Sequence, residues 1–467
     1  MSWMGCWQRS RRRANRPPFP IMKRNRTVSL GYPLPTVRYA AAMGVLGLAF
    51  FAWPGRNWAV LAAVNALLVT LLIVDYLLCV SLRGVDIERE LADTMSVGDS
   101  VPLVWSVENH HRRAIRITVA DALWPSLQAT RRRFTIDIPA STRSRQRTEL
   151  HPIRRGRFPL NDITVRIAGP LRLVAKQGTR SVPDTVRVMP AYPSRQQVQR
   201  RVRIQRVIES GARTARSNGG GTEFDQLRDY RPGDEFRRMD WASSVRLQRP
   251  IIKQFRAEQN QHVVVLLDNG RVMAGTVAGA ARVEHAMDAA LAVTQTAVAL
   301  GDRVGMVAFD RSIRAIMASS NASNQVGRAA ETMFLLEPEL VESAYTVAFS
   351  AAAARFKRRS LFVVLTDFSE ATVEQSLLPA LPILTRKHLV VIAGVYDPQV
   401  AEWASGGRHS WPSEVFRQAA AVASFDQRGR AAARLVSAGA VVIDAAPGDL
   451  AIRLVDTYVE LKGSGRW

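Results

Sequence analysis

The sequence predicts an α/β membrane protein in three parts: two N-terminal transmembrane helices, a small antiparallel β-sandwich-like domain, and a doubly wound α/β domain. Three patterns support this prediction. Two long apolar runs lie close to the N-terminus. Short runs in which apolar and polar residues alternate fill residues 85–190, and that period is typical of half-buried strands. From residue 262 onward, apolar runs of strand length alternate with helical patterns, as a parallel sheet with crossover helices requires.

The composition is that of a folded protein with a strong excess of positive charge. Hydrophobic residues make up 47% and charged residues 22% of the 467 residues, which is ordinary for globular chains and enough for several folded units. The formal net charge of +24 favours a polyanionic partner, which could be nucleic acid, anionic lipid or an acidic protein. Cys6 and Cys79 suggest neither a disulfide framework nor a zinc site, so we expect a reducing compartment.

The N-terminal region is expected to anchor the chain in a membrane. Residues 1–36 should be a disordered basic arm, because they contain many arginines, several prolines and no acid. Residues 37–82 are the predicted transmembrane hairpin. A span takes about 20 residues, and the second apolar run reaches this length, whereas the first is near the lower limit. A signal peptide is the alternative, but a second apolar run follows within four residues of the first.

Basic residues flank the predicted hairpin on both sides. By the positive-inside rule they place both termini in the cytoplasm and the hairpin in a bacterial inner (plasma) membrane. Asp75 lies within the second apolar run, close to its cytoplasmic end. An acid inside a membrane segment is a functional candidate, and we expect a snorkelling or helix–helix contact role for it.

Residues 85–190 are predicted to form the β-rich domain, because alternating runs are separated by turn residues. Basic clusters at 131–133 and 143–147 are expected on its loops. Aromatic residues are not interleaved among them, which argues against single-stranded nucleic acid. Attraction to the anionic lipid of the inner leaflet is favoured, with a solvated surface and nucleic acid as alternatives. The expected strands are 101–107, 114–119, 133–138 and 163–167.

Residues 191–220 are expected to be a basic linker, and residues 221–261 a signature segment that packs on the next domain. Acids and arginines alternate around aromatic residues in 221–241. A self-satisfied ion-pair network is the first interpretation, a docking surface for a partner is the second, and catalysis is the third. The partner-docking candidates are Arg228, Arg231, Asp234, Arg237 and Asp240. The aromatic residues expected to bury the segment against the next domain are Phe224, Tyr230, Phe236 and Trp241.

Residues 262–467 are predicted to form the α/β domain. In open α/β sheets ligands bind beyond the carboxyl ends of the strands. Asp268 and Asp367 stand at such ends, on strands that we expect to be neighbours. The expected strands are 262–267, 303–309, 313–317, 360–366, 389–395 and 440–443, and the expected helices are 282–300, 326–335, 346–356, 373–384, 413–438 and 450–461.

The sequence offers no catalytic constellation, so we do not expect an enzyme. It contains no Walker loop, no Gly-x-Ser-x-Gly elbow, no His-Glu-x-x-His pair and no Cys-x-x-Cys motif. Glu284, His285 and Asp288 could share one helix face, which we interpret as the solvent-facing side of that helix. A hydrolase of unknown substrate is kept as an alternative.

Residues 221–241, GTEFDQLRDYRPGDEFRRMDW, resemble the signature of the bacterial domain-of-unknown-function 58 family. Residues 154–158, 169–171 and 458–463 are also similar to that family. The resemblance implies a membrane-anchored protein with a von Willebrand factor A-like domain. It further implies partnership with a MoxR-type AAA+ ATPase, often alongside a transglutaminase-like membrane protein. It implies no settled biochemical activity.

The same resemblance raises the question of a metal. The von Willebrand factor A-type adhesion site binds Mg²⁺ through Asp-x-Ser-x-Ser, a loop Thr and a further Asp. Here Gly270 and Val272 stand where the serines would be, so two hydroxyl ligands that a hard cation needs are missing. Thr346 only roughly fits the loop Thr. We therefore expect Asp268 and Asp367 to form a vestigial, unoccupied site, and we expect no cofactor.

The favoured function is a membrane-anchored interaction scaffold that faces the cytoplasm, as a partner or adaptor of the MoxR-type ATPase. A nucleic-acid-binding membrane protein is the alternative, and its affinity for oligonucleotides would fall steeply with salt. We expect no nucleic-acid partner.

Overall fold

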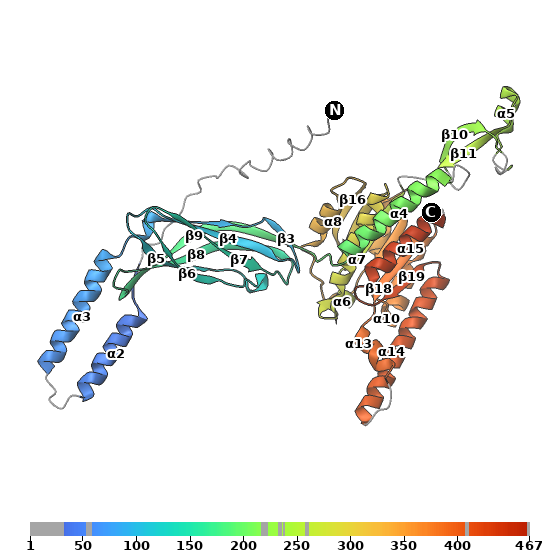
Figure 1. Cartoon of the computed structure of the whole chain (residues 1–467). Helices are drawn as coiled ribbons and strands as arrows, with labels where there is room; N and C mark the ends of the chain where they lie inside the picture. The colour runs from blue at the N-terminus through green and yellow to red at the C-terminus, as the bar shows by residue number, and fades with distance from the viewer. Residues whose placement is uncertain are drawn as a thin grey trace, which may run out of the picture.

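The computed structural model describes residues 32–52, 58–215, 223–231, 236, 239–256, 261–406 and 411–464. It comprises a pair of apolar helices, a β-rich domain, an α/β domain and a projecting arm (Figure 1). The prediction of a mixed α/β protein is confirmed.

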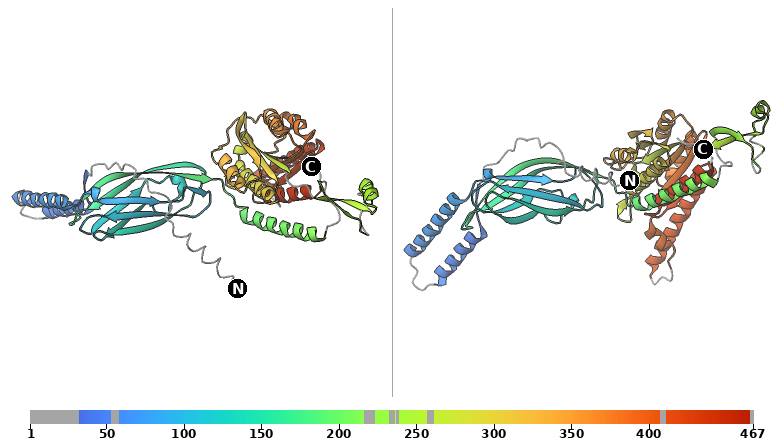
Figure 2. Two further views of the ribbon diagram at one scale, coloured as in Figure 1. Left: turned by 90° about the horizontal axis from the view of Figure 1, so that it is seen from above. Right: turned by 45° about the horizontal axis from the view of Figure 1, so that its top comes forward.

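Two apolar helices, α2 (Val37–Ala52) and α3 (Trp58–Leu78), extend side by side from one end of the β-rich domain (Figures 1 and 2). Within the described ranges, one helical stretch is long and apolar enough to cross a membrane. It runs from Trp58 to Gly84 with a mean hydropathy of 2.3. Helix α2 has 16 residues, fewer than the ~20 that a span takes. The expectation of two spans therefore has support from α3 and not from the length of α2.

The β-rich domain contains two sheets that share one core. Trp105 is fully buried in this core, and its Nε1 donates to Asp121 at 2.8 Å. Asp121 also accepts from Arg89 at 2.6 Å, so the buried indole and the buried carboxylate are both satisfied. The larger sheet contains β1 (Tyr32–Pro35), β3 (Thr94–Ser96), β5 (Ile115–Asp121), β6 (Arg133–Ile138), β8 (Gly156–Ala168) and β9 (Val174–Met189), and the smaller contains β2 (Val85–Glu90), β4 (Val101–Asn109) and β7 (Arg143–Leu150).

Two segments of this region differ from expectation. Residues 143–147, expected on a loop, begin β7, and Tyr32–Pro35, expected in the disordered arm, pair with β9. In β7 arginines alternate with other polar residues, so the strand period is present without an apolar signal. Arg143 is held by an ion pair with Glu88 of the same sheet at 2.6 Å. The rest of the predicted arm, 1–31, lies outside the described residues.

Asp75 fastens the end of α3 to the β-rich domain. It is fully buried, and its carboxylate accepts backbone N–H groups from Leu171 at 2.7 Å, Leu173 at 2.8 Å and Val174 at 2.9 Å. A Cβ on Gly169 would lie 2.5 Å from Asp75 Oδ1, so only glycine fits there. The expected snorkelling or helix–helix role was wrong, because the three donors of this loop satisfy the carboxylate within the protein.

The start of α2 is tied to the same loop. Thr36 donates its N–H to the carbonyl of Leu173 at 2.9 Å and its hydroxyl to the carbonyl of Arg172 at 2.6 Å. Lys176 donates to the carbonyl of Cys79, just beyond α3, at 2.6 Å. Both helices are therefore held at their bases by the turn between β8 and β9.

The α/β domain is built on a sheet with the strand order β16-β15-β12-β17-β18-β19, in which all neighbours are parallel except β15 and β16. One face packs against α7, α8 and α15, and the other against α9 and α14. The strands are β12 (His262–Asp268), β15 (Arg303–Phe309), β16 (Ile313–Ser320), β17 (Leu361–Leu365), β18 (Leu389–Val395) and β19 (Val441–Ala445). The long helices are α7 (Arg282–Ala299), α8 (Gln325–Met333), α9 (Tyr345–Arg355), α14 (Pro412–Ser437) and α15 (Leu450–Ser464). The short elements of the chain are η1 (Leu82–Gly84), η2 (Pro125–Leu127), α6 (Arg271–Ala274), β13 (Thr276–Val277), β14 (Ala280–Ala281), α10 (Glu370–Thr372), η4 (Val373–Leu377), α11 (Leu378–Ala380), α12 (Pro382–Thr385) and α13 (Pro398–Ala404).

The expected basic linker contains a helix, α4 (Arg195–Ala215). Val198 and Val202, one turn apart, are buried in the core that α7 lines. Arg206 further down the helix donates to the carbonyl of Ala299, at the end of α7, at 2.6 Å. Two valines at helical spacing are a weak apolar signal among arginines and glutamines, which is why the segment resembles a linker.

The two large domains meet along a polar interface. Arg155 of the β-rich domain is only 6% exposed, and it pairs with Glu284 of α7 at 2.8 Å. Arg154 beside it reaches Glu337 at 2.6 Å. Asp288, one turn after Glu284, is also buried and accepts from the hydroxyl of Ser194 at 2.8 Å. The interpretation of this α7 face as solvent-facing was wrong, because the preceding domain and the entry to α4 cover it.

The signature segment forms an arm that projects from the α/β domain (Figures 1 and 2). Strands β10 (Glu223–Asp229) and β11 (Ile251–Arg256) pair with each other, and α5 (Trp241–Leu247) lies between them in sequence. The expected burial is not found for Phe236 and Trp241, which are 67% and 65% exposed. Tyr230 is half-buried, and the side chain of Phe224 lies outside the described residues. The hairpin satisfies its own backbone groups, so it does not need the α/β domain for pairing.

The hydrogen bonds from the turn after β8 to Asp75, which we call the latch, yield a first prediction. An orphaned buried donor costs about 1–3 kcal/mol, so Asp75→Ala, which orphans three N–H groups, should destabilise the detergent-solubilised protein by several kcal/mol. Gly169→Ala should act the same way by displacing the carboxylate, whereas Gly327→Ala, where a Cβ meets nothing within 4 Å, should be neutral or stabilising. Thermal unfolding of the β-rich domain measures the effect, and equal stability of all three variants would refute the latch.

Candidate functional site at the carboxyl ends of the central strands

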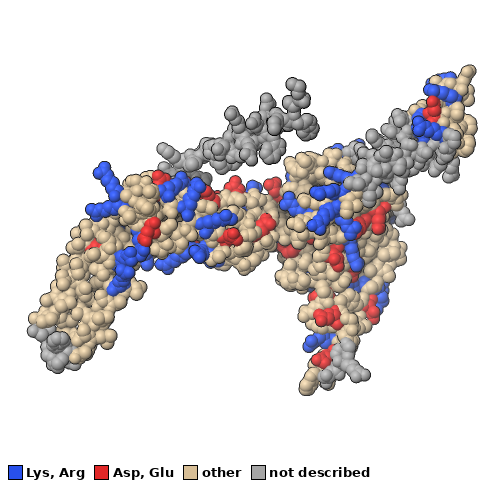
Figure 3. All heavy atoms as spheres, in the orientation of Figure 1, with Lys and Arg blue, Asp and Glu red and all other residues tan. Residues whose placement is uncertain are grey.

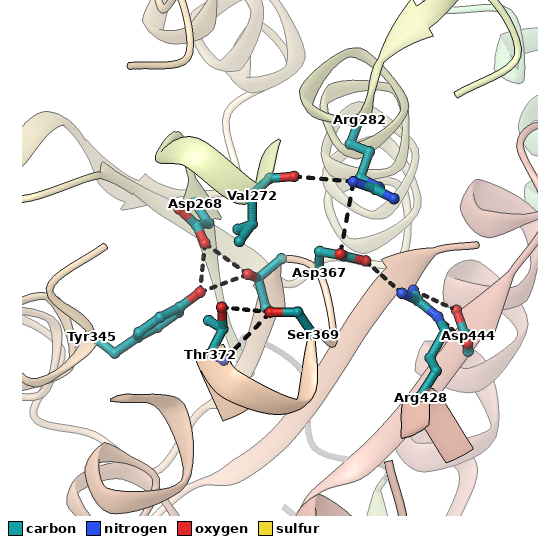
Figure 4. A network of polar contacts seen from close by, with 10 residues as sticks. Asp268, Val272, Arg282, Tyr345, Asp367, Ser369, Thr372, Arg428 and Asp444 are labelled. Carbon is teal, nitrogen blue, oxygen red and sulfur yellow. Dashed lines mark hydrogen bonds and ion pairs between the residues drawn. The ribbon is translucent and has the colours of Figure 1, made fainter. Parts of the chain in front are cut away.

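The predicted pair of acids lies where two neighbouring parallel strands end. Leu267 of β12 is in register with Leu365 of β17, so the residues that follow them, Asp268 and Thr366, are at the same level of the sheet edge. Asp367 comes next. Figure 4 shows Asp268 beside Tyr345 from the start of α9, whereas the carboxylate of Asp367 points away from them toward Arg282 and Arg428. The expectation that the two strands are neighbours is confirmed.

Asp268 is enclosed by hydrogen-bond donors. It has no exposed surface, and its Oδ1 accepts from Ser343 Oγ at 2.5 Å and from the N–H of Gly270 at 2.9 Å. Its Oδ2 accepts from the hydroxyls of Tyr345 at 2.6 Å and Thr366 at 2.7 Å. Each carboxylate oxygen therefore has two donors, all from this chain.

Burial dominates the electrostatics of this cluster. Burial raises the pKa of Asp268, while the hydrogen bonds from Ser343, Tyr345 and Thr366 act against that rise. Burial and the charge of Asp268 raise the pKa of Tyr345 well above its ordinary value. The phenol is therefore held in its protonated form, in which it can donate to the carboxylate.

Asp367 is neutralised by arginines instead of hydroxyls. Arg428 of α14 donates to Asp367 at 2.6 Å and, through two nitrogens, to Asp444 of β19 at 2.6 and 2.9 Å (Figure 4). Arg282 at the start of α7 lies 3.8 Å from the other oxygen of Asp367. Burial lowers the pKa of Arg428, but its bonds to Asp444 and Asp367 outweigh this and raise the pKa overall. The guanidinium stays charged and links two strand ends to one helix.

These residues do not fit a Mg²⁺ site. Both oxygens of Asp268 are already taken by donors, and a guanidinium holds Asp367. A Cβ on Gly270 would lie 2.1 Å from Ser343 Oγ and 2.9 Å from the carbonyl oxygen of Val341, so a serine ligand has no room there. Among the described residues, no group of three or more His, Cys, Asp and Glu side chains is arranged to hold a metal ion.

Several members of the network were not singled out from the sequence. Thr346, considered as the loop ligand, is exposed, and its neighbour Tyr345 is the residue that reaches Asp268. Arg428 is far from Asp367 in the chain, and nothing in its local sequence marks it. The available signal for Ser343 and Tyr345 was their position as polar residues at the entry to a helix.

The predicted docking residues lie in the projecting arm. Asp234 and Arg237 fall outside the described residues. Arg231 is exposed, and Arg228 is half-buried. Asp240 caps α5 by accepting the N–H of Ser243 at 3.1 Å, and this bond, with Lys253 nearby, lowers the pKa of Asp240. The ion pairs that are described join the motif to the second half of the arm, Asp229 to Arg249 at 3.0 Å and Asp240 to Lys253 at 3.4 Å.

The arm also exposes apolar side chains. Besides Trp241 and Phe236, Val245 is also exposed, at 78%. An exposed apolar surface of this kind on a protein with a well-packed hydrophobic core is typical of an interaction site. Its exposed large hydrophobic residues are Leu227, Phe236, Trp241, Val245 and Leu247.

Comparisons with known proteins agree with the family resemblance. Residues 226–412 match the model of the family described as "Protein of unknown function DUF58". The uncharacterized protein Rv1480 of Mycobacterium tuberculosis is 27% identical over 187 residues, 39% of this chain and 58% of that protein. YeaD of Bacillus subtilis, also uncharacterized, is 28% identical over 26% of this chain and 30% of its own length. The chain thus spans 58% of the length of the first relative and 30% of the length of the second.

Among solved structures, the conserved hypothetical protein BatB from Bacteroides thetaiotaomicron is similar at a TM-score of 0.30 and 13% identity. The similarity covers 44% of this chain and 98% of that one.

The tight fit around Gly270 gives a second prediction. Gly270→Ser should destabilise the protein by about 1–3 kcal/mol, the usual cost of overpacking, because the new Cβ meets a backbone carbonyl. Gly429→Ser on α14, where nothing lies within 4 Å of a Cβ, is the matched control. Denaturant unfolding measures the stability, and calorimetry of the Gly270→Ser, Val272→Ser double variant should detect no gain of Mg²⁺ binding. A stable double variant with a stoichiometric Mg²⁺ site would contradict this account of the strand ends.

Proposed function

We propose that this chain, which belongs to the DUF58 family through residues 226–412, is a membrane-anchored scaffold of the bacterial inner membrane. Its arm would dock a partner, for which the resemblance of the sequence favours a MoxR-type AAA+ ATPase. The observation that carries the proposal is an apolar helix at one end of the molecule and an exposed apolar and basic arm at the other (Figure 1).

The membrane end is supported by its charge distribution. Figure 3 shows the apolar helices almost without charged side chains and Lys and Arg gathered on the adjoining end of the β-rich domain. Arg38 lies in the first turn of α2, and Arg83 follows α3. Arg112 and Arg113 come directly after His111, whose ring contacts the carbonyl of Ser81 just beyond α3. A basic collar at this level favours the cytoplasmic, anionic leaflet. In the proposal α2 and α3 cross the bilayer as a hairpin.

The α/β domain is the proposed rigid support. Its mainly parallel sheet with helices on both faces supports a von Willebrand factor A-like fold, in which the strand-end site has become structural. In place of a cation, hydroxyl donors hold Asp268 and a guanidinium holds Asp367. We propose that the protein binds its partners without a metal and has no enzymatic activity of its own.

The arm is the proposed docking element. Large rings with neighbouring arginines are the residue types that dominate the binding energy of interfaces. Trp241 and Val245 are exposed on α5, with Arg246 in its last turn and Arg231 exposed nearby. Such a surface fits a partner with an apolar pocket bordered by acidic residues. A transglutaminase-like protein in the same membrane is a further partner that the family resemblance favours.

The proposed topology is tested with a reporter. Alkaline phosphatase, which is active only outside the cytoplasm, should give no activity when fused after residue 467, because the basic collar holds that side of the chain inside. A green fluorescent protein fusion at the same point should be bright and membrane-bound, which controls for expression. Strong phosphatase activity would refute the proposed orientation.

The docking role is tested with two exposed apolar residues. Trp241→Ala should greatly reduce co-purification of the MoxR-type ATPase from native membranes, whereas Leu340→Ala should not, although Trp241 is 65% and Leu340 79% exposed. Both variants should keep the wild-type unfolding free energy to within about 0.5 kcal/mol, as surface substitutions usually do. Full retention of the ATPase by Trp241→Ala, or equal loss in both variants, would contradict docking through the arm.

A further inference from the structure

A second apolar surface lies at the free end of the α13–α14 hairpin. Helix α14 has 26 residues, and its buried residues are Ala421, Ala431 and Leu435. Of these, Ala431 and Leu435 belong to the core of the α/β domain, and both lie in the C-terminal half of the helix. The first turns of α14 and the adjoining α13 stand clear of the domain (Figure 1). The sheet therefore does not explain the composition of this tip.

The tip exposes large apolar side chains close together. Trp411 is 68%, Val415 52% and Phe416 76% exposed, all within the first turn and a half of α14 or just before it. Arg417 follows, with its guanidinium 5.4 Å from the ring centre of Trp403 on α13. A Trp, a Phe and an Arg next to one another form a surface that is apolar at its end and charged at its side.

The direction in which the α13–α14 hairpin projects indicates what its tip could contact. In Figure 1 and in the right-hand panel of Figure 2, the α13–α14 tip points to the same side of the molecule as α2 and α3, and the arm points to the opposite side. This orientation is defined by side chains, since Arg155–Glu284 and Arg154–Glu337 join the two domains.

We propose that the tip inserts Trp411, Val415 and Phe416 into the surface of the bilayer that α3 crosses. This inference rests on the proposed membrane anchoring and adds a second contact point to it. Tryptophan favours the headgroup level, where its apolar ring and its polar N–H are both satisfied. Phenylalanine is typical of the apolar face that an interfacial helix buries just below that level. Arg417 would reach toward lipid phosphates while its aliphatic stem stays with the rings.

A second attachment to the membrane would restrict the orientation of the molecule in a way that α2 and α3 alone do not. A rigid molecule anchored through α2 and α3 alone could still tilt as a whole relative to the membrane. Contact at the α13–α14 tip would fix that tilt and keep the arm directed away from the bilayer, where a cytoplasmic partner can reach it.

The test measures depth in the membrane. The full chain with Cys6→Ser and Cys79→Ala receives one cysteine, labelled with an environment-sensitive fluorophore, in nanodiscs of phosphatidylcholine and phosphatidylglycerol. Val415→Cys is the test position, and Val436→Cys near the other end of α14, 55% against 52% exposed, is the matched control. Leu67→Cys in α3 reports on the anchor itself. Lipids that carry a nitroxide near the headgroup are the quenchers for positions 415 and 436, and lipids that carry one on the acyl chain are the quenchers for position 67.

We expect quenching and a blue shift at 415, neither at 436, and loss of the signal at 415 when Trp411→Glu and Phe416→Glu are added. Equal, weak quenching at 415 and 436, with strong quenching at 67 by chain-labelled lipid, would overturn the tip contact while leaving the anchor intact. Absence of quenching at 67 would overturn the proposed membrane anchoring itself. A blue shift at 415 that persists in lipid-free detergent and depends on protein concentration would assign the tip to a second copy of this chain and refute the lipid contact.

Discussion

A single buried carboxylate decides how the apolar helices relate to the rest of the molecule. Asp75 closes the last turns of α3 by accepting three backbone N–H groups of the turn after β8. An unpaired buried acid would cost far more than the helix could compensate, so α3 and this turn must stay together. Gly169 is required for that approach, since any side chain would occupy the space of the carboxylate. The direction of α3 is thus transmitted to the β-rich domain without a flexible joint.

The β-rich domain is in turn joined to the α/β domain by a buried ion pair. Arg155 is buried between the domains and meets Glu284, which sets the α/β domain against the β-rich domain. Removing one partner of such a buried pair is costly, because it leaves an uncompensated charge behind. The family-like segments 154–158 and 169–171 therefore have physical roles: one holds the domains together and the other admits Asp75.

The sequence predicts the elements well where apolar side chains carry the signal. The continuous apolar run at 262–267 can only be a buried strand, and β12 follows it closely. Helix α4 was missed because two valines are its contact with the core. The aromatics of 221–241 were expected to be buried, but a hairpin that pairs with itself leaves Phe236 and Trp241 in solvent. Asp268 was found from its strand end, whereas its donors Ser343 and Tyr345 come from a distant loop that no local pattern connects to it.

The strand-end acids and the α13–α14 hairpin are parts of one arrangement. Arg428, which holds Asp367 and Asp444, is a residue of α14, and further along that helix Arg430 and Arg434 pair with Glu370 and Glu374. Asp367 therefore anchors a long helix, and the side chains that neutralise it also help to set the direction of the tip. The strand ends of this domain are thus connected to the orientation of a surface that lies far from them in the sequence.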